Sequence, residues 1–265
     1  MDEAVGDHAA YRRAVAFLAA DAYGRFMGRY SEPLAGQFVD WAGVEPGQRV
    51  LDVGAGPGAL TARLVERVGV ANVRAVDPST PFVAALRERC PGVEVQQGAA
   101  EALPLADDCV DAALAQLVVH FMTDPVAGLR EMARVTVAGG VVAVSVWDVS
   151  GGRAPMSDFL RAVRGTSAGA PEETGQQGTR EGELAEIGTA AGLRAVESGE
   201  LTVAVHYDTF EEWWEPYTLG VGPAGDHVAG LDEAGRVALR ERCREVLPPA
   251  PFDISATAWC ARGRA

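Results

Sequence analysis

The stretch from Val50 to Gly58, with the sequence VLDVGAGPG, constrains the fold of this chain more than any other. An apolar run of strand character, Arg49 to Val53, breaks into alternating glycines, and apolar residues at helical spacing follow. Glycine lets a backbone turn tightly and lets a ligand approach without a Cβ in the way. The N–H groups that open the following helix point at that ligand. An ordinary turn needs one glycine, so three in five positions favour a nucleotide-type ligand.

The residues around this turn narrow the choice of nucleotide. The spacing is G-x-G-x-G, whereas dinucleotide-binding turns have G-x-G-x-x-G. Asp52 stands two residues before Gly54, and a second strand ends at Asp77, which is placed to accept from both hydroxyls of a ribose. Asp77 alone would also suit NAD. Together these features resemble motif I, and the acidic residue that follows it, in class I S-adenosylmethionine-dependent methyltransferases.

Later segments carry the resemblance further. The segment Gly98 to Leu105 is similar to the family's G-D-A-E-x-L-P-F, whose backbone and acidic side chain hold the adenine edge. Ala99 departs from the usual aspartate, so the contact to the adenine amino group is lost or shifts to Glu101. The run Leu129 to Val135 resembles the family's L-x-E-x-x-R-V. The residues then expected at the cofactor, S-adenosyl-L-methionine, are Tyr23, Arg29, Asp52, Gly54, Ala55, Gly56, Gly58, Asp77, Pro78, Ala100, Glu101, Gln116 and Leu117.

The N-terminal part of the chain is predicted to be a helical lid, residues 1–44. A helix is expected over residues 7–22, and Ser31 is a candidate cap for a second helix. Between them, the segment Tyr23 to Tyr30 mixes arginines, aromatic residues and glycines. It resembles the leading segment of a small-molecule branch of the family, in which an arginine holds the methionine carboxylate. Arg29 is preferred to Arg25 for that role, and a helix junction with surface arginines is the alternative.

The order of elements predicts an α/β fold with a doubly wound sheet, in a single domain of residues 1–265. The resemblance implies a Rossmann-like, mostly parallel sheet of seven strands whose last strand is antiparallel, with helical cap insertions. Residues 45–148 form the expected cofactor-binding core, and residues 149–265 the C-terminal half with a cap at 206–250. The strands are expected at Arg49–Val53, Val73–Asp77, Val93–Gln97, Val110–Ala115, Val141–Asp148, Ala195–Val205 and Ile254–Ala261.

Methyl transfer is an in-line displacement, so alignment matters most, and a base is needed only for an acceptor that carries a proton. His120, just beyond the fourth strand, is the candidate base, and packing against the core is the alternative. Trp147, His206, Trp213 and Tyr217 are candidates for an acceptor pocket under the cap, although packing would also explain the aromatic residues. Asp148 has no cluster of carboxylates near it in the sequence, so no metal is expected.

Composition excludes other classes of function. The net charge of −14 disfavours a nucleic acid as the acceptor, because like charges repel. All basic residues are arginines, which excludes a lysine Schiff base and a P-loop lysine. No apolar run is long enough to cross a membrane, and the acidic N-terminus is unlike a signal peptide. Four scattered cysteines fit a reducing cytoplasm.

The predicted function is transfer of a methyl group to a small molecule, with the acceptor, the methylated atom and the oligomeric state left open. An NAD-dependent oxidoreductase is a second hypothesis, because of the glycine turn and Asp77, but the spacing of the glycines argues against it. A non-catalytic member of the same fold is the third, since a fold does not fix a function.

Overall fold

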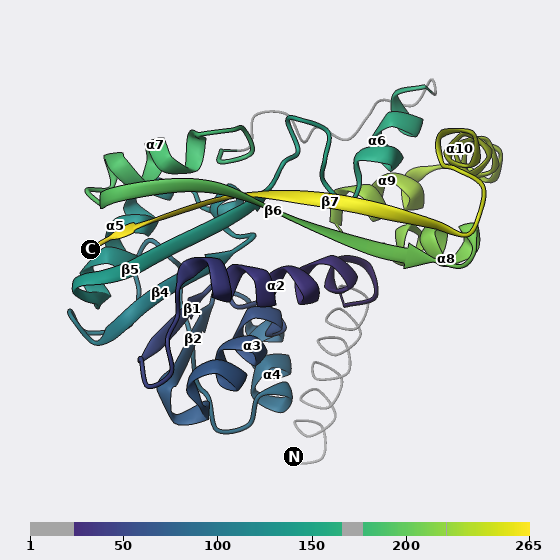
Figure 1. Ribbon diagram of the computed structural model, residues 1–265. Helices are drawn as coiled ribbons and strands as arrows, with labels where there is room; N and C mark the ends of the chain where they lie inside the picture. The colour runs from purple at the N-terminus through teal and green to yellow at the C-terminus, as the bar shows by residue number, and fades with distance from the viewer. Residues whose placement is uncertain (1–23, 166–176, 221) are drawn as a thin grey trace, which may run out of the picture.

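The computed structural model describes residues 24–165, 177–220 and 222–265. They form one sheet of seven strands in the order β3-β2-β1-β4-β5-β7-β6, in which β7 alone runs antiparallel to its neighbours (Figure 1). The strands are β1 Val50–Val53, β2 Val73–Asp77, β3 Glu94–Gln97, β4 Val110–Gln116, β5 Thr136–Trp147, β6 Arg194–Tyr207 and β7 Phe252–Arg264. The predicted doubly wound sheet is confirmed.

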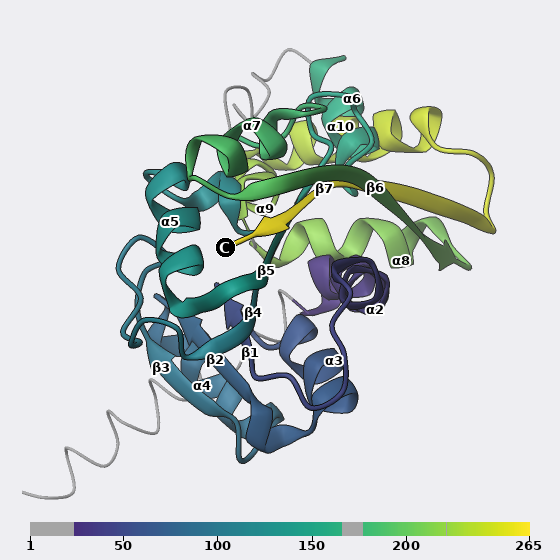
Figure 2. The same ribbon diagram turned by 60° about the vertical axis from the view of Figure 1, so that its left-hand side comes forward.

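Helices cover both faces of this sheet (Figures 1 and 2). On one face pack α2 Arg29–Ala42, α3 Ala59–Val68 and α4 Thr80–Arg89, through Phe38, Leu64 and Leu86. The other face is covered by α5 Pro125–Val135 and α7 Glu183–Ala190, through Met132 and Leu184. Each of these five side chains is at most 2% exposed, so the sheet lies between two dry hydrophobic layers.

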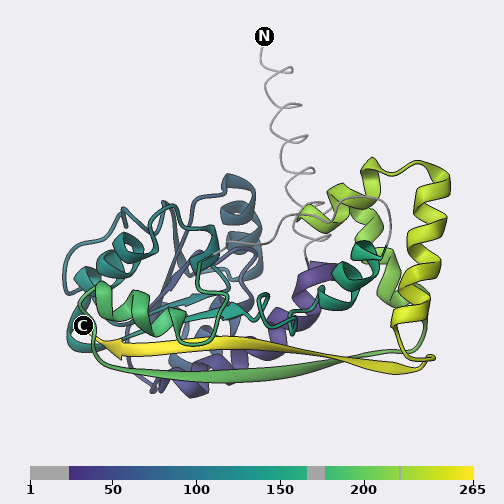
Figure 3. The ribbon, with the colours of Figure 1, turned by 90° about the horizontal axis from the view of Figure 1, so that it is seen from above.

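A third hydrophobic core lies beyond the end of the main sheet. The hairpin of β6 and β7 extends past the other strands, and helices gather around its far end (Figure 3). These helices are α6 Ser157–Arg164, α8 Phe210–Trp214, α9 Gly222–Gly230 and α10 Glu233–Val246. Their side chains form one cluster with Met27 and Tyr30 beside the start of α2 and with Trp147 at the end of β5. The expected cap is therefore an extension of the sheet with its own packed interior.

Strand β5 begins earlier than the sequence predicts. The strand was expected to start at Val141, but Gly139 and Gly140 already lie inside it. The N–H of Gly139 donates to the carbonyl of Ala265, and the N–H of Ala265 donates to the carbonyl of Gly140. A Cβ on Gly140 would lie 2.6 Å from the carbonyl oxygen of Asp111. Gly140 thus permits the close approach of Asp111 on β4. The partner at Ala265 lies more than 100 residues away in the sequence, so no local pattern reveals it.

Several helix ends also differ from the expectation. Ser31 lies inside α2, is 4% exposed and caps no helix. Ser79 precedes α4 without a side-chain cap, and its N–H donates instead to Asp77. The helix expected over residues 7–22 lies outside the described residues.

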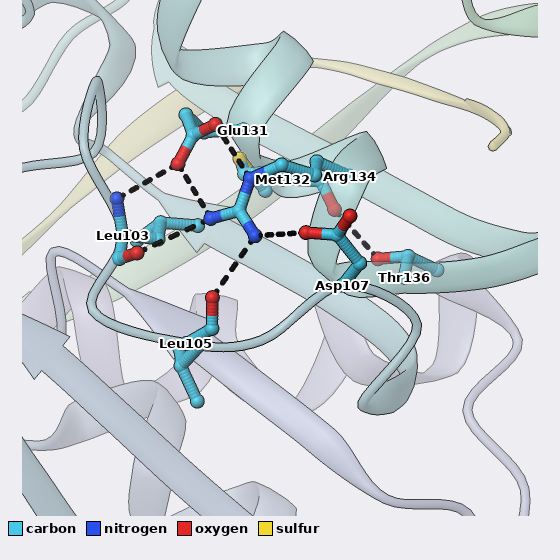
Figure 4. A network of polar contacts seen from close by, with 7 residues as sticks. All are labelled: Leu103, Leu105, Asp107, Glu131, Met132, Arg134 and Thr136. Atoms are coloured by element: carbon cyan, nitrogen blue, oxygen red, sulfur yellow. Dashed lines mark hydrogen bonds and ion pairs between the residues drawn. The ribbon is translucent and has the colours of Figure 1, made fainter.

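Arg134 on α5 holds the loop between β3 and β4 in place (Figure 4). Its guanidinium donates to the carbonyls of Leu103 and Leu105 at 3.2 and 2.9 Å, and to Asp107 at 2.6 Å. Glu131 accepts from the same guanidinium at 2.7 Å and from the N–H of Leu103 at 3.0 Å. One side chain therefore satisfies two backbone carbonyls of a loop that has no regular structure of its own.

We expect Arg134→Ala to lower the free energy of unfolding by about 1.5–3 kcal/mol, because it leaves two carbonyls and Glu131 without their charged donor. Urea unfolding measures this. Arg130→Ala on the same helix is the control, since that guanidinium makes one bond, to the carbonyl of Ala190, and its loss should stay within about 0.5 kcal/mol. Equal losses in the two variants would contradict the assigned role of Arg134.

Candidate functional site

Three glycines with positive φ form the turn between β1 and α3. Gly54, Gly56 and Gly58 have φ values of 69°, 54° and 95°. A Cβ on Gly54 would lie 2.5 Å from the side chain of Val118, and one on Gly58 would lie 2.4 Å from Leu86. A Cβ on Gly56 would meet no atom within 4 Å. The first and third glycines therefore allow close packing, whereas the middle one leaves open space above the turn.

Asp77, at the end of β2, is tied to this turn. One carboxylate oxygen accepts from the N–H of Gly56 and the other from the N–H of Ser79, both at 2.8 Å. The side chain is 5% exposed. Burial raises the pKa of the Asp77 carboxyl, and the two N–H donors oppose that rise because they favour the charged form. Asp77 thus fixes the position of the Gly56 backbone. It lies at the edge of the sheet where the parallel strands end.

Asp52 lies in the middle of β1 and faces α3. It is 1% exposed and accepts a hydrogen bond of 2.6 Å from the hydroxyl of Thr61. Burial raises the pKa of the Asp52 carboxyl to about 7, and the bond from Thr61 opposes that rise. A cation bound beside Asp52 would lower the pKa of this carboxyl and favour its charged form.

A cavity of about 340 Å³ opens above the glycine turn. Eight of the residues predicted from the sequence line it: Asp52, Gly54, Ala55, Gly56, Asp77, Pro78, Gln116 and Leu117. The lining residues that the sequence did not indicate are Ser31, Pro57, Ala59, Leu60, Ser79, Phe82, Val118 and Phe121. Most of these lie within a few residues of a predicted site residue. Extending the predicted site along the chain beyond the ends of β1, β2 and β4 would therefore have included them. Ser31 comes from α2, and no sequence signal links it to the turn.

The end of β4 is shaped by an unusual backbone. Leu117 has a φ of 61°, which is rare for a residue with a side chain, and its N–H donates to the carbonyl of Ser145 at 2.8 Å. Gln116 donates from its side-chain amide to the carbonyl of Ser31 at 3.0 Å. This turn directs Leu117 and Val118 at the cavity, and strained backbone of this kind concentrates at functional sites.

Several predicted cofactor residues lie elsewhere. Arg29 donates to the carbonyl of His206, forms an ion pair of 2.8 Å with Glu212 and stacks over Tyr207, so it does not line the cavity. Glu101 accepts from the N–H of Thr123 at 2.8 Å. Ala100 is buried in the core, and Gly58 shapes the turn without lining the cavity. Tyr23 lies outside the described residues. The alternative interpretation of Arg29, a helix junction, matches its position.

Neither candidate histidine lines the cavity. Burial lowers the pKa of His120 to about 4, and its ring packs against Phe121 with centroids 3.9 Å apart. His206 is exposed and bonds Asp253 at 2.7 Å, and this contact raises the pKa of His206. The position of His120 therefore agrees with the packing alternative.

The candidate acceptor residues lie in the cap core. Tyr217 stacks on Phe159 with ring centroids 4.4 Å apart and contacts Trp213 at 4.8 Å. Trp147 meets Tyr30 edge-on at 6.4 Å. The three candidates Trp147, Trp213 and Tyr217 are each at most 3% exposed. Their rings surround one another, so packing accounts for them in the free protein.

Among the described residues, no group of three or more acidic, histidine or cysteine side chains is arranged to hold a metal. Asp148 is bound by the N–H of Gly151 at 2.7 Å and by Arg153 at 2.6 Å, which neutralises it. A search of the described residues finds no helix that is both long and apolar enough to span a bilayer.

Comparison with known proteins agrees with the geometry. A family model described as a methyltransferase domain matches residues 51–144. An uncharacterised methyltransferase of Mycobacterium bovis is 42% identical over 130 residues, which are 49% of this chain and 50% of that protein. The chain thus spans about half the length of that curated relative. An uncharacterised protein of the same organism is 31% identical over 219 residues, 77% of each chain.

A solved structure shares the fold. The YcgJ protein of a Bacillus superposes with a TM-score of 0.56 at 20% identity, covering 87% of this chain and 97% of that one. The sheet order, the glycine turn with Asp77 and the matched family model all agree. The chain belongs to the class I S-adenosylmethionine-dependent methyltransferases.

The buried carboxyl of Asp52 should make stability depend on pH. Its pKa rises from 3.8 to about 7 on folding. The folded protein then holds the proton more tightly, so this contribution is complete below the unfolded pKa and is lost as the pH rises through about 7. We therefore expect the free energy of unfolding of the wild type to fall as the pH rises from about 5 to 8, and that of Asp52→Asn to fall less. Urea unfolding of the free protein at a series of pH values measures both.

Asp111→Asn is the control, because Arg49 lowers the pKa of Asp111. Its contribution is present above the unfolded pKa and is lost as the pH falls, so it has the opposite sign. An unchanged slope in Asp52→Asn would contradict the raised pKa.

Proposed function

We propose that this protein is an enzyme that transfers a methyl group from S-adenosyl-L-methionine to a small molecule. The observation that carries the proposal is the cavity above the glycine turn, with Asp77 at its edge and open space over Gly56. Such a turn, at the carboxyl ends of parallel strands and at the start of a helix, binds a nucleotide through its backbone.

The residues of the cavity fit this cofactor. Asp77 would accept from the ribose hydroxyls, since each of its oxygens has a further lone pair beyond the one used by Gly56 or Ser79. Asp52 lies at the other side of the turn, where a carboxylate suits the cationic amino-acid end. The loop that Arg134 fixes would bound the adenine side.

S-adenosylmethionine supplies, when bound, a methyl group on a sulfonium, so that an acceptor lone pair forms the new bond, the carbon–sulfur bond breaks and its electron pair remains on sulfur. The protein's part is to align the acceptor with that methyl group. The lining residues include no histidine, and His120 is held by packing. We therefore propose that the acceptor proton leaves to solvent instead of to a side chain of the cavity.

Two rival functions make different predictions. An NAD-dependent oxidoreductase would bind NAD, and calorimetry with NAD and with S-adenosylhomocysteine separates the two. A non-catalytic member of the fold would bind S-adenosylhomocysteine without turnover of any acceptor. The acidic net charge supports a small-molecule partner and argues against nucleic acid. The four cysteines are unpaired, which supports our proposal of a cytoplasmic location.

We expect Asp77→Ala to weaken the binding of S-adenosylhomocysteine by about 1.5–3 kcal/mol, because hydrogen bonds to a charged group are lost. Isothermal titration calorimetry measures the effect. Asp77→Asn keeps one acceptor oxygen and should lose less, and thermal unfolding checks that Gly56 and Ser79 still hold the turn. An unchanged affinity in folded Asp77→Ala would refute the cofactor site.

The segments 1–44 and 206–250 remain proposals as lid and cap. Two ion pairs support a joint role, because Arg25 bonds Glu215 at 2.7 Å and Arg29 bonds Glu212 at 2.8 Å. These pairs join the start of α2 to the cap. We propose that the cap encloses the acceptor and that α2 carries the cap's inner wall.

Trp213→Ala tests the cap. We expect it to cost about 3–5 kcal/mol of stability, since Trp213 is 2% exposed. At a temperature where the variant stays folded, the acceptor KM or kcat should change while the affinity for S-adenosylhomocysteine stays nearly constant. Normal acceptor kinetics would show that the cap merely covers the end of the sheet. Trp41→Ala, which removes an aromatic ring that packs against another hydrophobic cluster and does not line the cavity, controls for loss of an aromatic side chain.

A further inference from the structure

Two buried polar atoms, which belong to residues that line the cavity, have no hydrogen-bond partner within residues 24–165, 177–220 and 222–265. They are the hydroxyl oxygen of Ser31 and the side-chain oxygen of Gln116. Both residues line the cavity, and they are 4% and 9% exposed. A buried polar atom without a partner costs free energy, so such atoms call for an explanation.

The orientation of the Gln116 amide is fixed. Its nitrogen donates to the carbonyl of Ser31 at 3.0 Å. The opposite orientation would set two oxygens against each other, so the free atom of Gln116 is its oxygen, which can only accept. The hydroxyl of Ser31 can accept as well. The site is therefore built for a ligand group with a hydrogen to donate.

The order of the strands separates this pair from the groups assigned to the cofactor. Strand β1 lies between β2 and β4, so the glycine turn lies between Asp77 on one side and Gln116 on the other. Leu117, next to Gln116, belongs to the hydrophobic cluster of the cap. The Ser31–Gln116 pair is thus on the cap side of the cavity.

Charge also divides the cavity. Its lining holds two carboxylates, Asp52 and Asp77, and no basic side chain among the described residues. A cationic amino group is better matched by the Asp52 carboxylate than by a neutral amide and a hydroxyl. No described side chain of the lining could pair with an anionic acceptor. Leu60, Leu117 and Val118 make the remaining wall apolar.

We propose that Ser31 and Gln116 bind the methyl acceptor, and that the acceptor is an uncharged, mainly apolar molecule that presents an N–H or O–H to this pair. This inference rests on the proposed function and names the substrate class of the same site. It assigns Gln116 to the acceptor instead of to the cofactor.

The test uses protein saturated with S-adenosylhomocysteine and three probes that share one ring system. A naphthol carries the donor, its methyl ether lacks the donor, and the corresponding hydroxynaphthoate adds a negative charge. We expect calorimetry to show the naphthol binding about tenfold more tightly than either relative, as for one hydrogen bond satisfied at a buried acceptor. Equal binding of the three, tighter binding of the hydroxynaphthoate, or no binding of the naphthol would overturn the proposal.

Variants then assign the effect to the pair. Ser31→Ala and Gln116→Met should each reduce naphthol affinity to about that of the methyl ether, with an unchanged dissociation constant for S-adenosylhomocysteine. Ser145→Ala is the matched control, because that hydroxyl is also buried without a partner but does not line the cavity. It should change neither affinity.

The two proposals fail in different ways. If Ser31→Ala and Gln116→Met weaken S-adenosylhomocysteine instead and leave the naphthol unaffected, the pair serves the cofactor and this inference is wrong. If the wild-type protein does not bind S-adenosylhomocysteine at all, the proposed function itself fails.

Discussion

Val118 packs where a side chain on residue 54 would have to lie, so this part of the cavity wall requires glycine. This contact brings the turn after β1 against the residues after β4, and the rest of the site depends on it. Leu117 adopts a left-handed backbone conformation next to Val118, and Gln116 reaches across to Ser31. Any larger residue at position 54 would push these strand ends apart and open the wall on which both proposed ligand subsites stand.

Local sequence was sufficient to predict the residues of the glycine turn and of the strand ends that line the cavity. The glycine turn, Asp52 and Asp77 follow short apolar strands whose ends meet at one edge of a parallel sheet, so their proximity follows from the topology. The side of the cavity formed by Ser31 and Gln116 could not be predicted in the same way. The sequence predicts Ser31 as a helix cap, yet the helix starts earlier, at Arg29, and the carbonyl of Ser31 accepts from Gln116 at the end of β4. A contact between residues 31 and 116 leaves no trace in either segment.

Arginine and aromatic residues show why side-chain type alone does not define a site. Arg29 has the chemistry to hold a carboxylate, but Glu212 supplies that carboxylate from within the chain. Trp213 and Tyr217 have the large apolar side chains expected of an acceptor pocket, but these side chains pack in the hydrophobic cluster of the cap helices. In both cases the partner of the side chain is set by long-range contacts between α2, β6 and α8.

The position of β7 has a consequence for how the chain is made. This strand, the last of the seven in the sequence, lies between β5 and β6 and forms hydrogen bonds to both. Until residues 252–264 have left the ribosome, the edges of β5 and β6 stay unpaired and the cap helices lack half of the hairpin on which they pack. Exposed strand edges favour wrong pairing. The nascent chain therefore depends on late completion of the sheet, and its cofactor half, β1 to β4, has time to form first.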